Sequence, residues 1–238
     1  MEIKVIFDKE AISKNLHTGW GLSILIDKKI LFDTGEKGNW LIENMKSMNI
    51  NMDEIEGIVI SHDHWDHTGG LKTILKEKKN KTPVYICKDF SDDLKEMIKD
   101  CGGEVVEVKV WDEISKNIYT TGEIKGTYKG SFMPEQAVIL KTENGITILT
   151  GCAHPGIIEI INIVKNKFKE EKIFLVIGGF HLLEKEKRFI DFIVKEFKKM
   201  NVEKVGPCHC SGPEAEKIFE NEYKDKFVSV KTGISIIV

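Results

Sequence analysis

Apolar residues in the first sixty positions form short runs separated by turn residues. Glu2–Phe7 alternates as a strand does, and Leu22–Ile26 and Ile30–Phe32 flank a polar turn, which is typical of a hairpin. Positions 40–48 repeat apolar side chains at helical spacing, and Ile55–Ile60 is a short apolar run of the kind that forms a buried strand. This part of the chain is therefore predicted to alternate between strands and helices.

The same alternation continues through residues 71–128. Helices are predicted at 71–75 and from Ser91 to the Cys101-Gly102-Gly103 stop, because apolar positions recur three or four apart there. Strands are predicted at 84–87, 105–110, 117–120 and 123–128.

The second half of the chain repeats this order. Ala137–Lys141 and Ile146–Leu149 flank Asn144-Gly145, a strong hairpin signal. Further strands are predicted at 173–177, 204–206 and 233–238, with helices at 157–164, at 189–197 and before the last strand. Strands interleaved with helices indicate sheets covered by helices. No linker or low-complexity tract interrupts the pattern, so one domain over residues 1–238 is expected.

Composition narrows the class of protein. With 41% hydrophobic and 31% charged residues the chain is typical of globular proteins, and a net charge of -3 gives no reason to expect nucleic acid as a partner. No apolar run reaches the ~18 residues of a membrane span, and the N-terminus lacks the apolar core of a signal peptide. Five scattered cysteines suit a reducing compartment. We therefore expect a cytoplasmic protein without a membrane partner.

The most informative stretch is the segment 61–70, Ser-His-Asp-His-Trp-Asp-His-Thr-Gly-Gly, which follows the apolar run Ile58-Val59-Ile60. Three imidazoles and two carboxylates within six consecutive positions are hard to explain by core packing. Imidazole and carboxylate are ligands that Zn, Fe and Mn share. The segment therefore predicts a metal site.

Other candidate ligands also follow short apolar strands. Five strand ends carry one: Asp33, His62, His154, His181 and His209. If the strands lie side by side, these ends meet at one edge, where loops on a rigid sheet often carry function. Two divalent ions that share a hydroxide need about six ligands, more than one loop supplies. In an extended loop His62 and His64 point the same way and can hold one ion, while Asp66 and His67 face a second.

The motif His62-x-His64-x-Asp66-His67, with the upstream turn Phe32-Asp33-Thr34-Gly35, resembles the metallo-β-lactamase superfamily over nearly the whole chain. The resemblance implies an α/β fold, a four-layer αββα sandwich with a two-metal site on one edge. It implies two ligand sets: His62, His64 and His154 for the first ion, and Asp66, His67 and His209 for the second. Two divalent ions are expected, zinc first, with manganese and iron as alternatives.

The sequence departs from the superfamily pattern in two places. Met133-Pro134-Glu135-Gln136-Ala137 stands where a Gly-His-Thr-type motif is usual, so His154 is expected to replace the missing histidine, and Glu135 and Gln136 are candidate substrate contacts. Cys152 occupies the place of a bridging carboxylate, either as a thiolate ligand or as a small buried residue beside the ligands. Cys208 and Cys210 form a Cys-x-Cys pair, which alone is weak evidence for a separate zinc site.

Four segments resemble one subgroup of the superfamily in particular: 61–67, 150–154, 178–182 and 207–212. The subgroup is named for the dihydropterin-ribofuranosylaminobenzene-phosphate synthase of methanopterin biosynthesis. This resemblance implies a hydrolase or transferase that acts on a phosphoester or pyrophosphate of a small phosphorylated molecule. The sequence leaves the oligomeric state open.

Asp66 and His181 are the predicted catalytic residues. His181 has two interpretations, as a proton donor or phosphate contact at the metal site, or as a support for the Gly178-Gly179 turn. Asp33 is expected to accept a hydrogen bond from a ligand histidine and so to fix its tautomer. Two other functions stay open: a di-iron redox or oxygen-sensing protein on the same fold, and a non-catalytic metal-binding protein.

Overall fold

A computed structural model describes all residues, 1–238, and the contacts within the chain divide it into two compact units. The first unit comprises residues 1–109 and 231–237, and the second comprises residues 110–230 with Val238. Each unit has its own mixed sheet and its own hydrophobic core. The mixed α/β architecture is therefore confirmed, whereas a single domain stays a prediction.

The sheet of the first unit has seven strands in the order β15-β1-β2-β3-β4-β5-β6. Antiparallel pairing joins β15, β1, β2 and β3, and parallel pairing joins β3 through β6. The bounds are β1 (Glu2–Phe7), β2 (Ser23–Ile26), β3 (Ile30–Phe32), β4 (Gly57–Val59), β5 (Pro83–Cys87), β6 (Glu104–Val108) and β15 (Ser235–Ile237).

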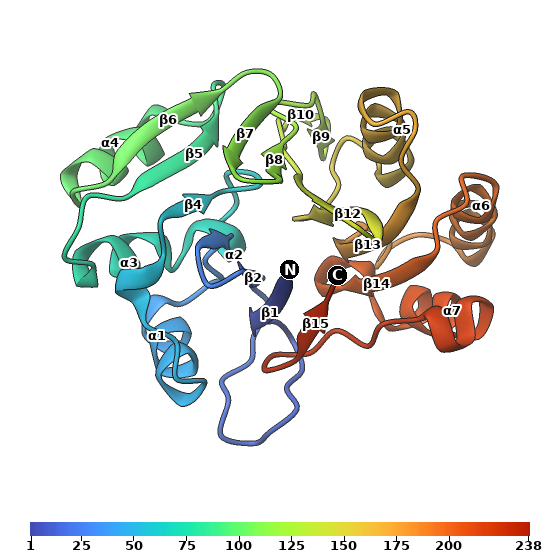
Figure 1. Cartoon of the computed structure of the whole chain (residues 1–238), viewed down its shortest axis with the longest axis horizontal. Coiled ribbons are helices and arrows are strands. Elements are labelled where there is room, and N and C mark those ends of the chain that lie inside the picture. The colour runs from blue at the N-terminus through green and yellow to red at the C-terminus, as the bar shows by residue number, and fades with distance from the viewer. The chain divides into compact units, whose positions relative to one another are not determined.

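Helices α1, α3 and α4 lie along one side of this sheet (Figure 1). They bury Leu41, Ile74 and Ile98 in one apolar cluster with Ile58 and Ile86 of the sheet. The helical spacing of apolar residues in the sequence places them on one face of each helix, and this face packs against the strands. The helices are α1 (Gly38–Ser47), η1 (Met52–Glu54, a 3-10 turn), α2 (Trp65–Thr68), α3 (Leu71–Glu77) and α4 (Asp92–Asp100).

The sheet of the second unit has six strands in the order β14-β13-β12-β11-β8-β7. Strands β12, β13 and β14 are parallel, and the other neighbours are antiparallel. The bounds are β7 (Asp112–Ser115), β8 (Ile118–Thr120), β11 (Val138–Thr142), β12 (Gly145–Thr150), β13 (Ile173–Gly179) and β14 (Lys204–Cys208), and a separate hairpin pairs β9 (Thr127–Tyr128) with β10 (Ser131–Phe132).

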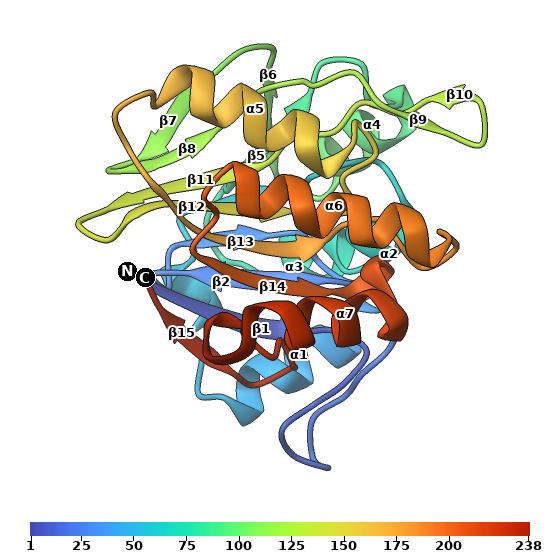
Figure 2. The ribbon, with the colours of Figure 1, turned by 90° about the vertical axis from the view of Figure 1, so that its right-hand side faces the viewer.

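Helices α5, α6 and α7 run side by side along the second unit (Figure 2). Their apolar faces join the sheet in one core, where Phe180, Phe197 and Phe219 form an aromatic cluster with ring centroids 5.2–5.7 Å apart. The helices are α5 (Ile157–Lys167), α6 (Lys187–Lys199), η2 (His209–Ser211, 3-10), α7 (Pro213–Tyr223) and η3 (Lys224–Lys226, 3-10). No helix of either unit is long and apolar enough to cross a membrane.

Three local predictions differ from the structure. The segment after His64 closes the helical turn α2 instead of continuing as an extended loop. The strand predicted at 123–128 is reduced to Thr127–Tyr128, paired with the unpredicted β10. The unpredicted β7 is a sheet edge that begins with Asp112 and Glu113, so its sequence lacks the apolar alternation of a buried strand.

Candidate metal centre

The carboxyl ends of parallel strands position the candidate ligands within each unit. In the first unit Asp33 follows β3 and His62 follows β4. In the second unit Cys152, His181 and His209 follow β12, β13 and β14. Because neighbouring parallel strands end at the same edge of a sheet, the turns of each unit are brought together. The predicted convergence of strand ends is therefore confirmed within each unit.

Asp33 organises the cluster of the first unit. Its carboxylate is fully buried, and Oδ1 accepts the Ser61 backbone N–H at 2.7 Å. Oδ2 accepts the Ser61 hydroxyl at 2.7 Å and lies 2.7 Å from Nδ1 of His67. A carboxylate at that position keeps the His67 proton on Nδ1 and leaves Nε2 with a lone pair for a metal. Asp33 thus lies within hydrogen-bond distance of His67, one of the histidines predicted as ligands.

The ring nitrogens of the histidine motif face one another. Because the Ser61 hydroxyl donates to Asp33, its oxygen can accept from His62 Nδ1, which lies 2.9 Å away. His62 Nε2 then faces His64 Nδ1 at 3.0 Å, and Asp66 Oδ2 lies 3.6 Å from His67 Nε2. His62, Asp66 and His67 are buried and His64 is half-buried. These nitrogen and oxygen donors fit zinc, manganese or iron.

The sequence around the motif holds it in place. Thr34 donates its backbone N–H and its hydroxyl to the His67 carbonyl, both at 2.8 Å. A Cβ at Gly70 would lie 2.2 Å from the Thr34 carbonyl oxygen, and one at Gly69 would lie 2.3 Å from that of Glu36. The two glycines after the motif are therefore what allow α2 to pack directly on the 34–36 turn.

Glu135 builds the turn that carries Cys152 and His154. Its buried carboxylate accepts three backbone N–H groups, from Cys152 at 2.9 Å, Ala153 at 2.8 Å and His154 at 2.7 Å. The structure therefore gives Glu135 a positioning role instead of the substrate contact considered from the sequence. Gln136 is also buried, and its Oε1 accepts the Thr120 hydroxyl.

Cys152 belongs to two groups of donor atoms in the second unit. The first group is Cys152, His154 and His181, and the second is Cys152, His209 and Cys210. In each group the ligand atoms lie within 4.8 Å of one another. From the sequence, Cys210 is considered only as part of a weak Cys-x-Cys pair and is not placed among the ligands. The structure puts its thiol beside Cys152 and His209, whereas Cys208 belongs to neither group.

The charges of this group favour a thiolate. Burial is the strongest single influence on the Cys210 thiol and raises its pKa, but a hydrogen bond with Cys152, the charge of His209, and the hydrogen bond and charge of His181 together bring that pKa well below its ordinary value. The hydrogen bond with Cys210, opposed by burial, raises the pKa of His181. A thiolate is the form of cysteine that binds metals.

Close backbone contacts fix the ends of β12, β13 and β14. A Cβ at Gly178 would lie 2.1 Å from the Thr150 carbonyl oxygen, and one at Gly179 would lie 2.6 Å from Cys210 Sγ. His181 and His209 both have positive φ, 53° and 49°. Such conformations in residues other than glycine are uncommon and cluster at functional sites.

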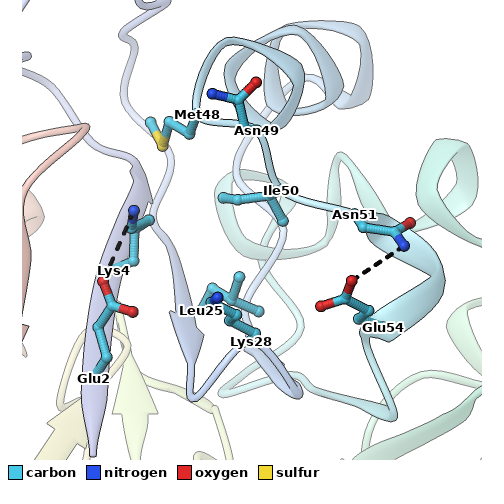
Figure 3. Close-up of a pocket in the computed structure, with 9 residues that line it drawn as sticks. All are labelled: Glu2, Lys4, Leu25, Lys28, Met48, Asn49, Ile50, Asn51 and Glu54. Atoms are coloured by element: carbon cyan, nitrogen blue, oxygen red, sulfur yellow. Dashed lines mark hydrogen bonds and ion pairs between the residues drawn. The ribbon is translucent and has the colours of Figure 1, made fainter.

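The pocket drawn in Figure 3 lies at the end of the first sheet opposite to Asp33. It has a volume of about 210 Å³ and is lined by Glu2, Lys4, Leu25, Lys28, Met48, Asn49, Ile50, Asn51 and Glu54. Lys28 lies in the turn before β3, whereas Asp33 follows the same strand. The pocket is therefore separate from the candidate ligands of the first unit.

Comparison with known proteins identifies the family to which the chain belongs. Residues 28–125 match a family model described as a β-lactamase superfamily domain. The crystal structure of Tm1679, a metal-dependent hydrolase of the β-lactamase superfamily, aligns with a TM-score of 0.85 and 29% identity over 100% of this chain and 99% of that one. The chain belongs to the metallo-β-lactamase superfamily, and the predicted fold class is confirmed.

Two sequence relatives come from Methanocaldococcus jannaschii. The 7,8-dihydropterin-6-methyl-4-(β-D-ribofuranosyl)-aminobenzene-5′-phosphate synthase is 33% identical over 90% of this chain and 88% of its own length. The uncharacterized protein MJ0448 is 29% identical over 88% of this chain and 90% of its own length. The resemblance to the synthase subgroup, inferred from four short segments, thus extends over most of the sequence.

Proposed function

We propose that this protein is a binuclear metal-dependent hydrolase or transferase that acts on a phosphoester or pyrophosphate of a small phosphorylated molecule. The observation that carries the proposal is the pair of donor clusters at strand ends. One holds His62, His64, Asp66 and His67 beside Asp33, and the other gathers histidines and thiols around Cys152. The similarity to a synthase whose name contains a 5′-phosphate supports the phosphorylated substrate.

The superfamily pattern assigns each ligand. His62, His64 and His154 would hold one ion, and Asp66, His67 and His209 the other. When bound, two divalent ions supply a hydroxide at neutral pH and stabilise developing negative charge. Zinc is the proposed metal because five of the six assigned ligands are imidazoles, and the thiols of Cys152 and Cys210 lie beside His154 and His209. The same thiols disfavour the carboxylate-rich site of a di-iron protein.

Within this site, side chains of the protein position a ligand histidine, the attacking water and the substrate. Asp33 keeps the His67 proton on Nδ1, so that Nε2 is available as a ligand. Asp66 is proposed to accept a hydrogen bond from the attacking water and so to orient it. His181 lies with the donor atoms of Cys152 and His154, and we assign it the contact with the substrate phosphate or the donation of a proton to the leaving group.

The relatives support two versions of the reaction. The synthase similarity supports transfer of a pterin-bearing group with release of pyrophosphate, as in methanopterin biosynthesis, whereas the similarity to Tm1679 supports hydrolysis. Both versions use the same ligands, and they differ in whether an acceptor molecule or water attacks.

An assay panel tests the proposal. Metal-loaded protein is incubated with pyrophosphate, a phosphodiester and a lactone, before and after a chelator. We expect turnover of a phosphorus substrate that is lost on chelation and restored by metal. His181→Asn should lower kcat with unchanged metal content, while His17→Asn, at a surface histidine paired with Glu43, should leave both unchanged. Turnover of the lactone alone contradicts the substrate class, and tight metal binding without any turnover supports a non-catalytic metal-binding protein.

A further inference from the structure

The β9–β10 hairpin projects from the second unit, beyond α5 (Figure 2). Thr127–Tyr128 pairs with Ser131–Phe132 through a tight turn in which Lys129 and Gly130 both have positive φ, 49° and 80°. Residues 124–134 contain two lysines and no acidic side chain, in a chain whose net charge is -3. The hairpin is therefore a locally cationic and exposed element.

The base of the hairpin packs on the backbone of a candidate ligand. A Cβ at Gly126 would lie 2.9 Å from the Pro155 nitrogen and 3.0 Å from the carbonyl carbon of His154. The Met133 N–H donates to the Gly126 carbonyl at 2.9 Å and closes the base. The position of the hairpin is thus tied to the turn that carries His154.

Tyr128 faces the candidate site from this hairpin. Its ring centroid lies 5.2 Å from that of His154 and 5.8 Å from that of His181, both in edge-to-face geometry. The Lys129 ammonium lies 5.1 Å from the Tyr128 ring centroid. One hairpin therefore places an aromatic ring beside two histidines of the candidate site and a cation beside that ring.

Phe132 provides a comparison on the same hairpin. Ser131 is opposite Tyr128 and Phe132 is opposite Thr127, so Tyr128 and Phe132 project from opposite faces of the two-stranded ribbon. Phe132 is 50% exposed. A substitution at Phe132 thus removes an aromatic ring from the hairpin without touching the face that carries Tyr128.

We propose that Tyr128 and Lys129 form the recognition element for a substrate that carries a flat aromatic ring close to a phosphate. The Tyr128 ring contacts the ring of the ligand, and the Lys129 ammonium attracts its phosphate. This inference rests on the proposed function and adds the substrate class and the residues that select it.

Calorimetric titration of the metal-loaded protein, residues 1–238, tests this inference with three probes: phenyl phosphate, methyl phosphate and inorganic phosphate. We expect phenyl phosphate to bind about 3- to 10-fold tighter than methyl phosphate, as an aromatic contact allows. Tyr128→Ala should abolish this preference and Tyr128→Phe should keep it. Lys129→Asn, which tolerates the positive φ, should weaken binding of all three probes by about 2- to 5-fold.

Phe132→Ala is the matched control and should bind all three probes as the wild type does. The assignment of the recognition element is wrong if Tyr128→Ala keeps the preference for phenyl phosphate or if Phe132→Ala loses it. Phosphate binding and the proposed function stand in either case. If the wild type binds none of the three phosphates, the proposed function fails and the recognition element fails with it.

Discussion

Asp33 and His67 are 34 positions apart in the chain, and Oδ2 of Asp33 lies 2.7 Å from Nδ1 of His67 in the buried end of the first sheet. Asp33 also accepts the backbone N–H and the hydroxyl of Ser61, the residue that precedes the histidine motif. One carboxylate therefore sets both the tautomer of His67 and the start of the loop that carries the other ligands.

Asp33→Asn should lower metal affinity by about 10- to 100-fold, because the amide group no longer offers two acceptor oxygens to Ser61 and His67. Competition with a chromogenic chelator measures the affinity. Asp63→Asn is the matched control, since Asp63 lies in the same loop but its carboxylate accepts the Ser91 N–H at 3.1 Å. Equal affinities of the two variants would show that Asp33 does not position a ligand.

Glu135→Gln should lower the free energy of unfolding by about 2–4 kcal/mol in urea denaturation of the metal-free protein. The variant keeps one acceptor oxygen, but its NH₂ group faces a buried backbone N–H of the 152–154 turn. Glu143→Gln, at an exposed turn, should change stability by less than about 0.5 kcal/mol. If the two variants are equally stable, the carboxylate of Glu135 does not hold the turn.

Gly178→Ala should destabilise the protein far more than Gly102→Ala. Both glycines have positive φ, 127° and 82°, but a Cβ at Gly178 meets the Thr150 carbonyl oxygen at 2.1 Å, whereas one at Gly102 has no neighbour within 4 Å. We expect a loss of about 1 kcal/mol at Gly102 and about 3 kcal/mol or more at Gly178. Thermal unfolding of both variants checks the difference, and similar losses would contradict the close strand contact.

The sequence predicted the elements whose apolar periodicity is strong. Helix α4 begins after Ser91 as expected, because the Ser91 hydroxyl accepts the Leu94 N–H at the first turn. The short helix α2 was missed because it lies within a polar motif, and β10 was missed because two residues are too few to show a period. Prediction from apolar periodicity therefore fails where a helix or strand is short or is stabilised by contacts with residues outside it.

The candidate site was predicted to the extent that its ligands are close together in sequence. The cluster from His62 to His67 is one motif, so its chemistry is visible without a structure. The role of Glu135 depends on backbone groups 17 to 19 positions later, and Cys210 Sγ meets the Cys152 carbonyl across 58 positions. The apolar periodicity of the sequence does not reveal such contacts, because they form only when the strands pair in the folded protein.

Metal content of the purified protein tests the central claim most directly. Elemental analysis after gel filtration should give about two divalent ions per chain for the wild type and for His17→Ala, whose ring is exposed and paired with Glu43. His62→Ala should lose at least one of them, because His62 faces both His64 and the ring of His67. Fewer than one ion per wild-type chain, or full metal content in His62→Ala, would contradict the account.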